Sequence, residues 1–350
     1  MIQEAGKLWG MRRLSDKYGR FKMTAVDQRP PIKNPIREIR GTDQAPWVDV
    51  AAFKTMLVEE LQSESSAMLL DPHFAYPAAA GVCDPEKGII LTLEDSLFTE
   101  TSGGRISREI DNWSVEKIKR VGGDAVKVLA WYRPDADKSV CQRQQDFVQR
   151  IGDACQKYDL PYVFELLSYP LSGDSEKTSD YVEMKSKKPE LVLESVRAFA
   201  DQKFGIDVFK LESPLAAENV PGVGGDGWEE AQAWFDQLGQ AAGRPWVMLS
   251  AGAGMDEFRN ILTHAYKAGA SGYLAGRAIW LDAFQDFPDW DAIRAKLRSD
   301  SIAYMRDINA LTDAEALPWQ SHSCYGQSGP VLINPDAGFR NHYSGFGGNS

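Results

Sequence analysis

Short runs of β-branched, aromatic and other apolar residues recur eight times along this chain of 350 residues. Most of them are nearly continuous in apolar residues rather than alternating, which is typical of parallel strands covered on both faces. Turn-forming residues bound each run. The predicted strands are residues 21–26, 66–70, 89–93, 125–131, 161–167, 206–211, 245–250 and 272–275.

Amphipathic stretches with helical periodicity separate most of these strands. The segment after the second strand offers only a short helix. Strand alternating with helix eight times over about 250 residues predicts a (β/α)8 TIM barrel, with a doubly wound sheet as the competing architecture. The predicted helices are residues 49–63, 138–158, 188–202, 227–242 and 255–269.

No shift in composition marks a linker between two domains. We therefore expect residues 1–310, including the N-terminal segment, to form a single catalytic barrel domain. Residues 311–350 are rich in Gly, Ser, Pro and aromatic side chains. We expect them to form a C-terminal extension that packs on the barrel or at a subunit contact.

The composition restricts location and partners. A net charge of −11 disfavours nucleic acid and anionic membranes, because both require a basic face. The sequence has neither an apolar leader nor an uncharged run of about 18 apolar residues, so we expect a cytoplasmic protein without a membrane partner. The four cysteines and four histidines form no metal-binding motif, which predicts reduced thiols and no metal.

Polar residues near the ends of the predicted strands are the candidate functional residues, because TIM barrels carry their chemistry at the carboxyl ends of the strands. They come from the first, fourth, fifth, sixth, seventh and eighth strands. These residues are Asp27, Gln28, Arg29, Lys127, Glu165, Ser168, Lys210, Glu212, Ser250, Ala251, Gly252, Gly276 and Arg277.

Lys210 lies inside an otherwise apolar strand, "IDVFKLESP". A buried ammonium is costly unless it is paired or loses its proton. One interpretation is an ion pair with Glu212 or another carboxylate of the barrel. The other is a nucleophile that forms a Schiff base, since a lysine amine attacks a carbonyl only in its neutral form, which desolvation or a nearby cation favours.

Three further residues fit the second interpretation. Lys127 lies two strands away on a strand of the same parity, so it could supply the nearby cation. Glu165 could transfer protons during carbinolamine and imine chemistry, and Asp27 could have a polar or proton-transfer role. The alternatives are structural: Lys127 and Glu165 could form an ion pair, and Asp27 could be a cap or a partner of Arg29.

Glycine-containing turns follow the last two strands, in "LSAGAG" (249–254) and "LAGRAIW" (274–280). Such turns expose backbone N–H groups to an anion, and Arg277 could bind it in a bidentate manner. This pattern predicts a phosphate site. The alternative is a pair of tight turns beside a surface arginine.

With these residues in place, the chain resembles the class I tagatose 1,6-bisphosphate aldolase family, to which the sulfofructosephosphate aldolases are also similar. The resemblance extends over roughly residues 20–280, in one order and spacing. It rests on "AVDQR" (25–29), "LLDP" (69–72), "DAVKVLAWY" (124–132), "FELLSY" (164–169), "DVFKLESP" (207–214), "SAG" (250–252) and "AGRAIW" (275–280).

The resemblance implies a role for each candidate. Lys210 would form the Schiff base, Lys127 and Glu165 would assist proton transfer, and Asp27 would lie beside the substrate. Ser250, Ala251, Gly252, Gly276 and Arg277 would hold the C1 phosphate, and Gln28 and Arg29 would lie toward C6. The reaction would need no metal or other cofactor, and we expect a homo-oligomer, a dimer or larger.

The expected reaction is cleavage of a phosphorylated ketohexose, such as tagatose 1,6-bisphosphate, into dihydroxyacetone phosphate and a three-carbon aldehyde. Two alternatives are a phosphosugar isomerase or epimerase without a covalent step, and a non-catalytic phosphometabolite sensor. Two features depart from the family: "PPIKNPIREIRG" (30–41) after Arg29, and the long C-terminal extension. We expect both near the C6 end of the substrate or the active-site mouth, so the C6 group could be phosphate, sulfonate or neither.

Overall fold

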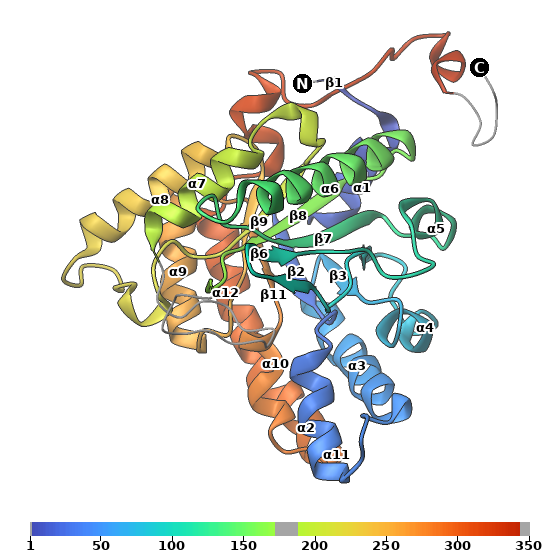
Figure 1. The fold of residues 1–350 in the computed structure, drawn as a ribbon, viewed down its shortest axis with the longest axis vertical. Coiled ribbons are helices and arrows are strands. Elements are labelled where there is room, and N and C mark those ends of the chain that lie inside the picture. Colours follow the sequence, from blue (N-terminus) through green and yellow to red (C-terminus); the bar gives the residue numbers. More distant parts are fainter. Residues whose placement is uncertain (1, 172–187, 344–350) are drawn as a thin grey trace.

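A computed structural model describes residues 2–171 and 188–343. Eight parallel strands form a closed barrel, in the order β10-β11-β2-β3-β4-β7-β8-β9 (Figure 1). All eight predicted strands are present, which confirms the TIM barrel and excludes the doubly wound sheet. The strands are β2 Phe21–Ala25, β3 Ala67–Leu70, β4 Gly88–Thr92, β7 Ala125–Trp131, β8 Tyr162–Leu167, β9 Val208–Leu211, β10 Trp246–Met248 and β11 Gly272–Ala275.

Helices surround the barrel (Figure 1). The five predicted ones are α3 Trp47–Leu61, α6 Lys138–Lys157, α7 Pro189–Phe199, α8 Trp228–Ala242 and α9 Met255–Lys267. The others are α1 Ala5–Leu14, α2 Pro30–Arg40, α4 Ala75–Ala79, α5 Val115–Arg120, α10 Arg277–Phe284, α11 Trp290–Lys296 and α12 Ile302–Glu315. Two small sheets pair β5 Thr99–Thr101 with β6 Gly104–Ile106, and β1 Ile2–Gln3 with β12 Val331–Leu332.

The proline-rich segment after Arg29 is the helix α2. Pro30 and Pro31 occupy its first turn, where the missing N–H groups have no partner inside a helix. Gly41 ends the helix in the left-handed conformation, with φ 64°, and donates back to the carbonyls of Arg37 and Glu38. Prolines therefore begin this helix instead of preventing it.

The barrel interior has an apolar layer at its amino-terminal end and a polar layer toward its carboxyl-terminal end. Phe21, Met23, Ala67 and Val208 belong to the apolar layer, and all four are fully buried. Because side chains alternate along a strand, residues two positions further on reach the same interior, as Lys210 does after Val208. The strands' outward residues pack against the surrounding helices in a separate core.

The C-terminal segment closes the amino-terminal end of the barrel. Trp319 and Tyr325 are buried in the same cluster as Met11 and Leu14 of α1, and the backbone N–H of Trp319 donates to the carbonyl of Gly19. The expectation that this segment lies at the active-site mouth is therefore wrong for the described residues up to 343. Its aromatic side chains fill the opposite end, where the apolar layer needs a cover.

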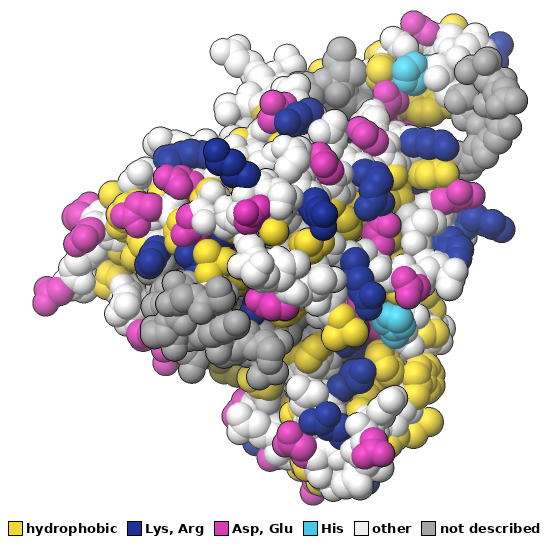
Figure 2. Space-filling view, in the orientation of Figure 1, with side chains coloured by type: hydrophobic (Ala, Val, Ile, Leu, Met, Phe, Trp, Pro, Cys, Tyr) yellow, Lys and Arg dark blue, Asp and Glu magenta, His cyan; other side chains and the backbone are white. Residues whose placement is uncertain are grey.

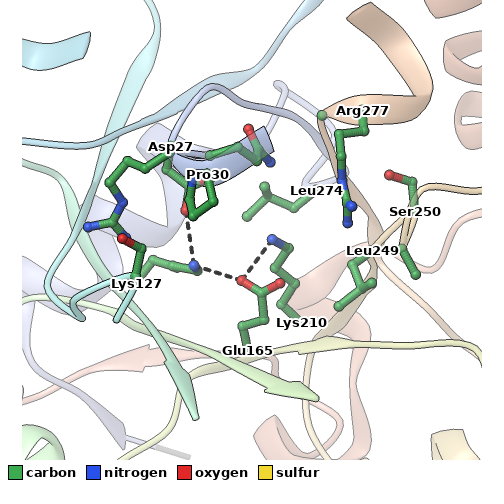
Figure 3. A pocket seen from close by; sticks show the side chains of 14 residues that line it. Asp27, Pro30, Lys127, Glu165, Lys210, Leu249, Ser250, Leu274 and Arg277 are labelled. Atoms are coloured by element: carbon green, nitrogen blue, oxygen red, sulfur yellow. Dashed lines mark hydrogen bonds and ion pairs between the residues drawn. The ribbon is translucent and has the colours of Figure 1, made fainter. Parts of the chain in front are cut away.

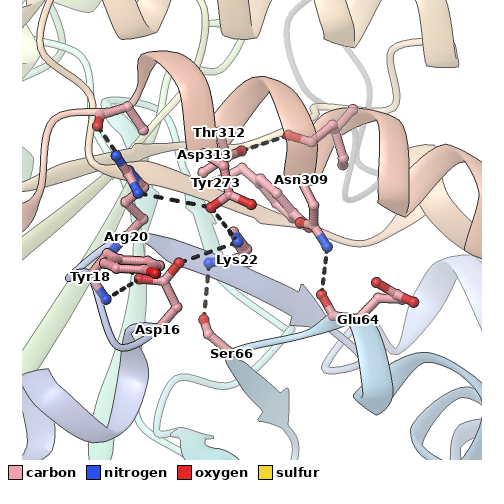
Figure 4. A network of polar contacts seen from close by, with 12 residues as sticks. Asp16, Tyr18, Arg20, Lys22, Glu64, Ser66, Tyr273, Asn309, Thr312 and Asp313 are labelled. Carbon is pink, nitrogen blue, oxygen red and sulfur yellow. Dashed lines mark hydrogen bonds and ion pairs between the residues drawn. The ribbon is translucent and has the colours of Figure 1, made fainter.

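Polar contacts join α12 to the start of the barrel strands (Figure 4). Lys22 of β2 contacts Asp313 at 2.6 Å, and Tyr273 of β11 donates to Asn309 at 2.7 Å. Asn309 in turn donates to the carbonyl of Glu64. These contacts hold the second half of α12 against the barrel. The helix continues past residue 310, where we expected the barrel domain to end and the C-terminal extension to begin.

On the face drawn in Figure 2, Lys and Arg side chains are interspersed with Asp and Glu. Neither sign gathers into one field over this face. Across residues 2–171 and 188–343, no helix combines the length and the apolar character that crossing a bilayer would require.

Candidate active site

Four predicted side chains meet inside the polar layer of the barrel (Figure 3). The ammonium of Lys127 donates to Asp27 Oδ2 at 3.0 Å and forms an ion pair with Glu165 Oε2 at 2.7 Å. Lys210 Nζ lies 2.9 Å from the same Glu165 oxygen. All four side chains are at least nine-tenths buried. One carboxylate oxygen therefore lies between two lysines.

The strand register explains this meeting. Glu165 of β8 is paired directly with Lys210 of β9, and Lys127 of β7 is paired with Val163, two residues before Glu165. Residues two apart on a strand share a face, so all three side chains enter the barrel interior. Asp27 follows β2 on the far side of the interior, and it reaches Lys127 across it.

The charges of this cluster support one another. Burial by itself raises the pKa of Asp27, but the positive charges of Lys127 and Lys210 outweigh burial and lower that pKa far below its ordinary value. The pKa of Glu165 is likewise raised by burial and lowered more by the same two lysines, so the net shift is downward. Both carboxyl groups are therefore ionised at neutral pH.

Glu212 has partners outside this cluster of four side chains. Its Oε1 accepts hydrogen bonds from the backbone N–H and the hydroxyl of Ser168, both at 2.7 Å. Within the described residues, Lys210 pairs with Glu165 and not with Glu212. Of the two kinds of partner expected for Lys210, Glu212 or another carboxylate of the barrel, the structure shows the second, Glu165 on the neighbouring strand.

The two glycine-containing turns lie together on the other side of the cavity. The chain turns after β10 through Ala251 and Gly252, whose φ angles are 45° and 77°. Arg277 is the first residue of α10, and a Cβ on Gly252 would be 3.5 Å from its Nη1. Figure 3 shows Ser250 and Arg277 on one side of Lys210, and Asp27 and Lys127 on the other. A helix N-terminus, a turn and a guanidinium thus face the same space.

All predicted site residues except Ser168, Glu212 and Gly252 line one cavity, and Gly252 is exposed beside it. Residues that the sequence did not single out complete the lining. These are Pro30, Ser96, Leu249 and Leu274.

A wider cavity of about 610 Å³ adjoins the first, and the two share Arg29, Pro30 and Ser96. Arg29 is 5% exposed, and its Nη2 donates to the carbonyl of Glu94. Its Nε and Nη1 have no partner among the described residues. Lys33 and His73 line the wider cavity together with the carboxylates Asp95 and Glu100, so its lining carries both signs of charge. α2 contributes Pro30 and Lys33 to this cavity, and its position toward the C6 end of a substrate stays a prediction.

Two polar residues of the cluster were missed from the sequence. Glu94 Oε1 accepts from Lys127 at 2.5 Å, and Thr92 donates to Asp27 at 3.1 Å. Both come from the end of β4 or just after it, a position that the rule on carboxyl ends of strands covers. The signal was therefore present in "ILTLED", where a carboxylate ends an apolar run.

Metal ligands are a separate question. The described ranges contain no group of three or more His, Cys, Asp and Glu side chains arranged to hold a metal ion.

A family model described as DeoC/LacD family aldolase matches residues 22–282. The chain belongs to this family of aldolases. Two curated relatives are similar over most of their length. Tagatose 1,6-diphosphate aldolase 1 of Streptococcus mutans is 33% identical over 319 residues, which cover 89% of this chain and 96% of that protein. Tagatose 1,6-diphosphate aldolase of Lactococcus lactis is 32% identical over 330 residues, covering 91% and 99%.

Solved structures share the fold of this aldolase. A Schiff base forming fructose-1,6-bisphosphate aldolase aligns with a TM-score of 0.57 at 18% identity and covers 87% of this chain and 98% of its own. Fructose-bisphosphate aldolase of Plasmodium falciparum aligns with a TM-score of 0.63 at 11% identity and covers 90% and 97%. The aldolase therefore has the TIM barrel of these enzymes.

Proposed function

We propose that this aldolase is a class I lyase that cleaves a phosphorylated ketohexose into dihydroxyacetone phosphate and a three-carbon aldehyde. The observation that carries the proposal is the position of Lys210. Its amine lies in the cavity between an ionised acid cluster and a site suited to phosphate. In a ketose 1-phosphate the keto carbon is next to the phosphorylated carbon, so a phosphate at Arg277 brings that carbon to Lys210.

Lys210 acts as the nucleophile. Its neutral amine attacks C2 of the ketose, and the resulting carbinolamine loses water to give a protonated imine. The imine accepts the electron pair when the C3–C4 bond breaks, which leaves an enamine of dihydroxyacetone phosphate and releases the aldehyde. Protonation of the enamine at C3 and hydrolysis of the imine then return the free lysine.

Glu165 is suited to move the protons, because it lies 2.9 Å from the Lys210 amine. It assists the loss of water and the removal of the C4 hydroxyl proton. Lys127 keeps Glu165 and Asp27 ionised by its charge. Asp27 Oδ1 has no hydrogen-bond partner among the described residues and is available to a substrate hydroxyl.

Ser250, Ala251, Gly252, Gly276 and Arg277 hold the C1 phosphate in this proposal. Gln28 and Arg29 face the other end of the sugar, where Arg29 Nε and Nη1, which have no partner among the described residues, favour an anionic C6 group. The curated relatives are named for tagatose 1,6-diphosphate, so we propose a ketose 1,6-bisphosphate of this kind as the substrate.

We also propose that the protein works in the cytoplasm as a homo-oligomer. Its four cysteines are free thiols, as is usual in reducing compartments. Trp9 and Tyr18 expose large apolar surfaces near the amino-terminal end of the barrel, which favours contact with another subunit. Light scattering of the purified protein measures its oligomeric state.

The test is turnover of a panel of ketose bisphosphates, with the triose products measured in the presence of a chelator. We expect unimpaired cleavage in the chelator. The Lys210→Met variant should lose at least about 10⁴-fold in kcat, because the covalent route is closed. If Lys210→Met retained wild-type turnover, the aldolase proposal would be wrong and a non-covalent isomerase would explain the site better.

A further inference from the structure

Glu94 is a buried carboxylate with no part in the mechanism above. It lies two residues beyond the end of β4 and is 2% exposed. It is not among the residues that line the active-site cavity. Its Oε1 is nevertheless 2.5 Å from Lys127 Nζ, nearer than the oxygens of Asp27 and Glu165. Glu94, which does not line the cavity, therefore contacts Lys127, which does.

The contact fixes the direction of the Lys127 ammonium. An ammonium has three N–H donors. Lys127 donates to Asp27 and Glu94 and faces Glu165 in an ion pair at 2.7 Å. Asp27 and Glu94 thus accept the hydrogen bonds of the ammonium, whereas Glu165 Oε2, which also pairs with Lys210, accepts none from the described residues despite its short distance. If Glu94 were absent, one N–H donor would become available for a hydrogen bond to Glu165.

The backbone holds Glu94 in place. Arg29 Nη2 donates to its carbonyl at 3.1 Å, and an isolated antiparallel bridge pairs Glu94 with Glu109. Its second carboxylate oxygen, Oε2, is buried and has no hydrogen-bond partner among the described residues. Burying a carboxylate with an unsatisfied oxygen destabilises the folded state. The contact with Lys127 is the interaction that offsets this cost.

We propose that Glu94 is a positioning residue that keeps the N–H donors of Lys127 directed at Asp27 and at Glu94 itself, so that Glu165 stays available to Lys210 and to the substrate. This inference rests on the proposed function, because it assigns Glu165 the proton transfers. Glu94 acts through Lys127 and touches no reacting atom.

The pH dependence of activity distinguishes a positioning role of Glu94 from a role in packing alone, because only the positioning role depends on the ionisation of Glu94. Burial raises its pKa above the ordinary value, and the charges of Lys127 and Arg29 reduce the rise without cancelling it. Asp27 raises it further, and Tyr162 of β8 lies near enough to feel the charge of Glu94. Because protonated Glu94 holds the ammonium less well, activity should fall as the pH drops through this raised pKa.

The experiment compares Glu94→Gln with Glu109→Gln, the matched change on the other side of the bridge. Glu109 pairs with Arg150 at the surface, at 2.9 Å, so its variant should keep kcat within about two-fold. Glu94→Gln should lower kcat by about 10- to 100-fold, the effect of losing a hydrogen bond to a charged group. Its KM should change by less than about three-fold, since Glu94 is outside the cavity, and the acid limb of the kcat–pH profile should disappear.

Wild-type kcat in Glu94→Gln, or a lowered kcat with the acid limb unchanged, overturns the inference. If Glu94→Gln does not fold, Glu94→Asp replaces it. That variant keeps the charge but is one methylene too short, so it should lose kcat and keep the acid limb, and wild-type kcat in it also overturns the inference. Borohydride reduction with dihydroxyacetone phosphate separates failure of the aldolase proposal from failure of the Glu94 proposal. Wild-type protein that forms no adduct on Lys210 refutes the aldolase mechanism itself.

Discussion

At the scale of single residues, two buried lysines are kept in place by carboxylates from other strands. Lys127 and Lys210 are 1% and 4% exposed, and each contacts Glu165. Burying two ammonium groups is costly unless charges and hydrogen bonds compensate. Asp27 and Glu165 supply that compensation, so the groups proposed for catalysis also stabilise the fold.

Asp27→Asn tests this link between charge and stability. The folded state lowers the pKa of Asp27, so ionised Asp27 adds stability above its unfolded pKa of about 3.9 and loses this contribution as the pH falls through the lower folded value. At pH 7 the variant should lose about 2 kcal/mol in the free energy of unfolding. Urea unfolding should show the difference shrinking below about pH 4. A difference that stays constant between pH 7 and pH 3 would contradict this explanation.

The sequence predicted the residues of the site better than their partners. Lys127, Glu165 and Lys210 were found because a charge inside an apolar strand is conspicuous and strand periodicity gives its direction. Glu212 seemed the natural partner of Lys210, since both face the same way on one strand. The partner is Glu165 instead, because register between neighbouring strands decides the contact, and a single sequence does not contain that register.

At the scale of elements, the turn after β11 is positioned by the close approach of its backbone to that of Ala25 at the end of β2. A Cβ on Gly276 would lie 2.6 Å from the carbonyl oxygen of Ala25 and 2.7 Å from Gln28 Nε2. The turn after β11 therefore packs directly against the end of β2. This contact brings the start of α10, with Arg277, up to the cavity.

Gly276→Ala should therefore weaken phosphate binding. The added methyl group must displace the backbone of Ala25 or the side chain of Gln28, which moves Arg277 away from the turn after β10. We expect the Kd for dihydroxyacetone phosphate to rise about ten-fold, which corresponds to about 1.4 kcal/mol. Titration calorimetry measures it.

Gly254→Ala is the matched control, because a Cβ there would meet nothing closer than Glu257 at 3.5 Å. Its Kd should stay within about two-fold of the wild-type value. Equal Kd values for the two variants would show that the close approach at Gly276 does not position the phosphate site.

The eight strands could be predicted because each is a buried apolar run of ordinary length. α2 could not, because its prolines suggest an irregular segment unless the helix start is known to lie there. The position of the C-terminal segment was also missed, since its aromatic residues identify a buried surface without saying which end of the barrel it covers.

At the scale of the whole molecule, the two ends of the barrel have separate tasks. α1 and the segment around Trp319 and Tyr325 close the amino-terminal end, while the cavity opens among the loops at the carboxyl-terminal end. Figure 1 shows β1 and the red C-terminal segment, up to residue 343, on one side of the molecule. Side chains at the amino-terminal end can therefore be changed without touching the cavity.

Trp319→Ala should be strongly destabilising with little effect on catalysis. Trp319 is 1% exposed and packs against Tyr325 with ring centroids 5.5 Å apart. Its loss should cost about 3–5 kcal/mol in the free energy of unfolding, measured by urea denaturation. Below its unfolding temperature, kcat/KM should remain within about three-fold of wild type.

Val331→Ala, in the exposed strand β12, is the comparison and should cost less than about 0.5 kcal/mol. A Trp319→Ala protein with wild-type stability would contradict the structural role of the C-terminal segment. One with intact folding and a large loss of kcat/KM would show that the two ends are coupled.

The central claim is that Lys210 forms a covalent imine with the ketose. The protein is incubated with dihydroxyacetone phosphate, reduced with borohydride and digested, and the modified peptide is identified by mass spectrometry. We predict one adduct, on Lys210, which is absent in Lys210→Met and absent without borohydride. Cleavage of the ketose with no adduct on Lys210, or with the adduct on Lys127 instead, would contradict the account.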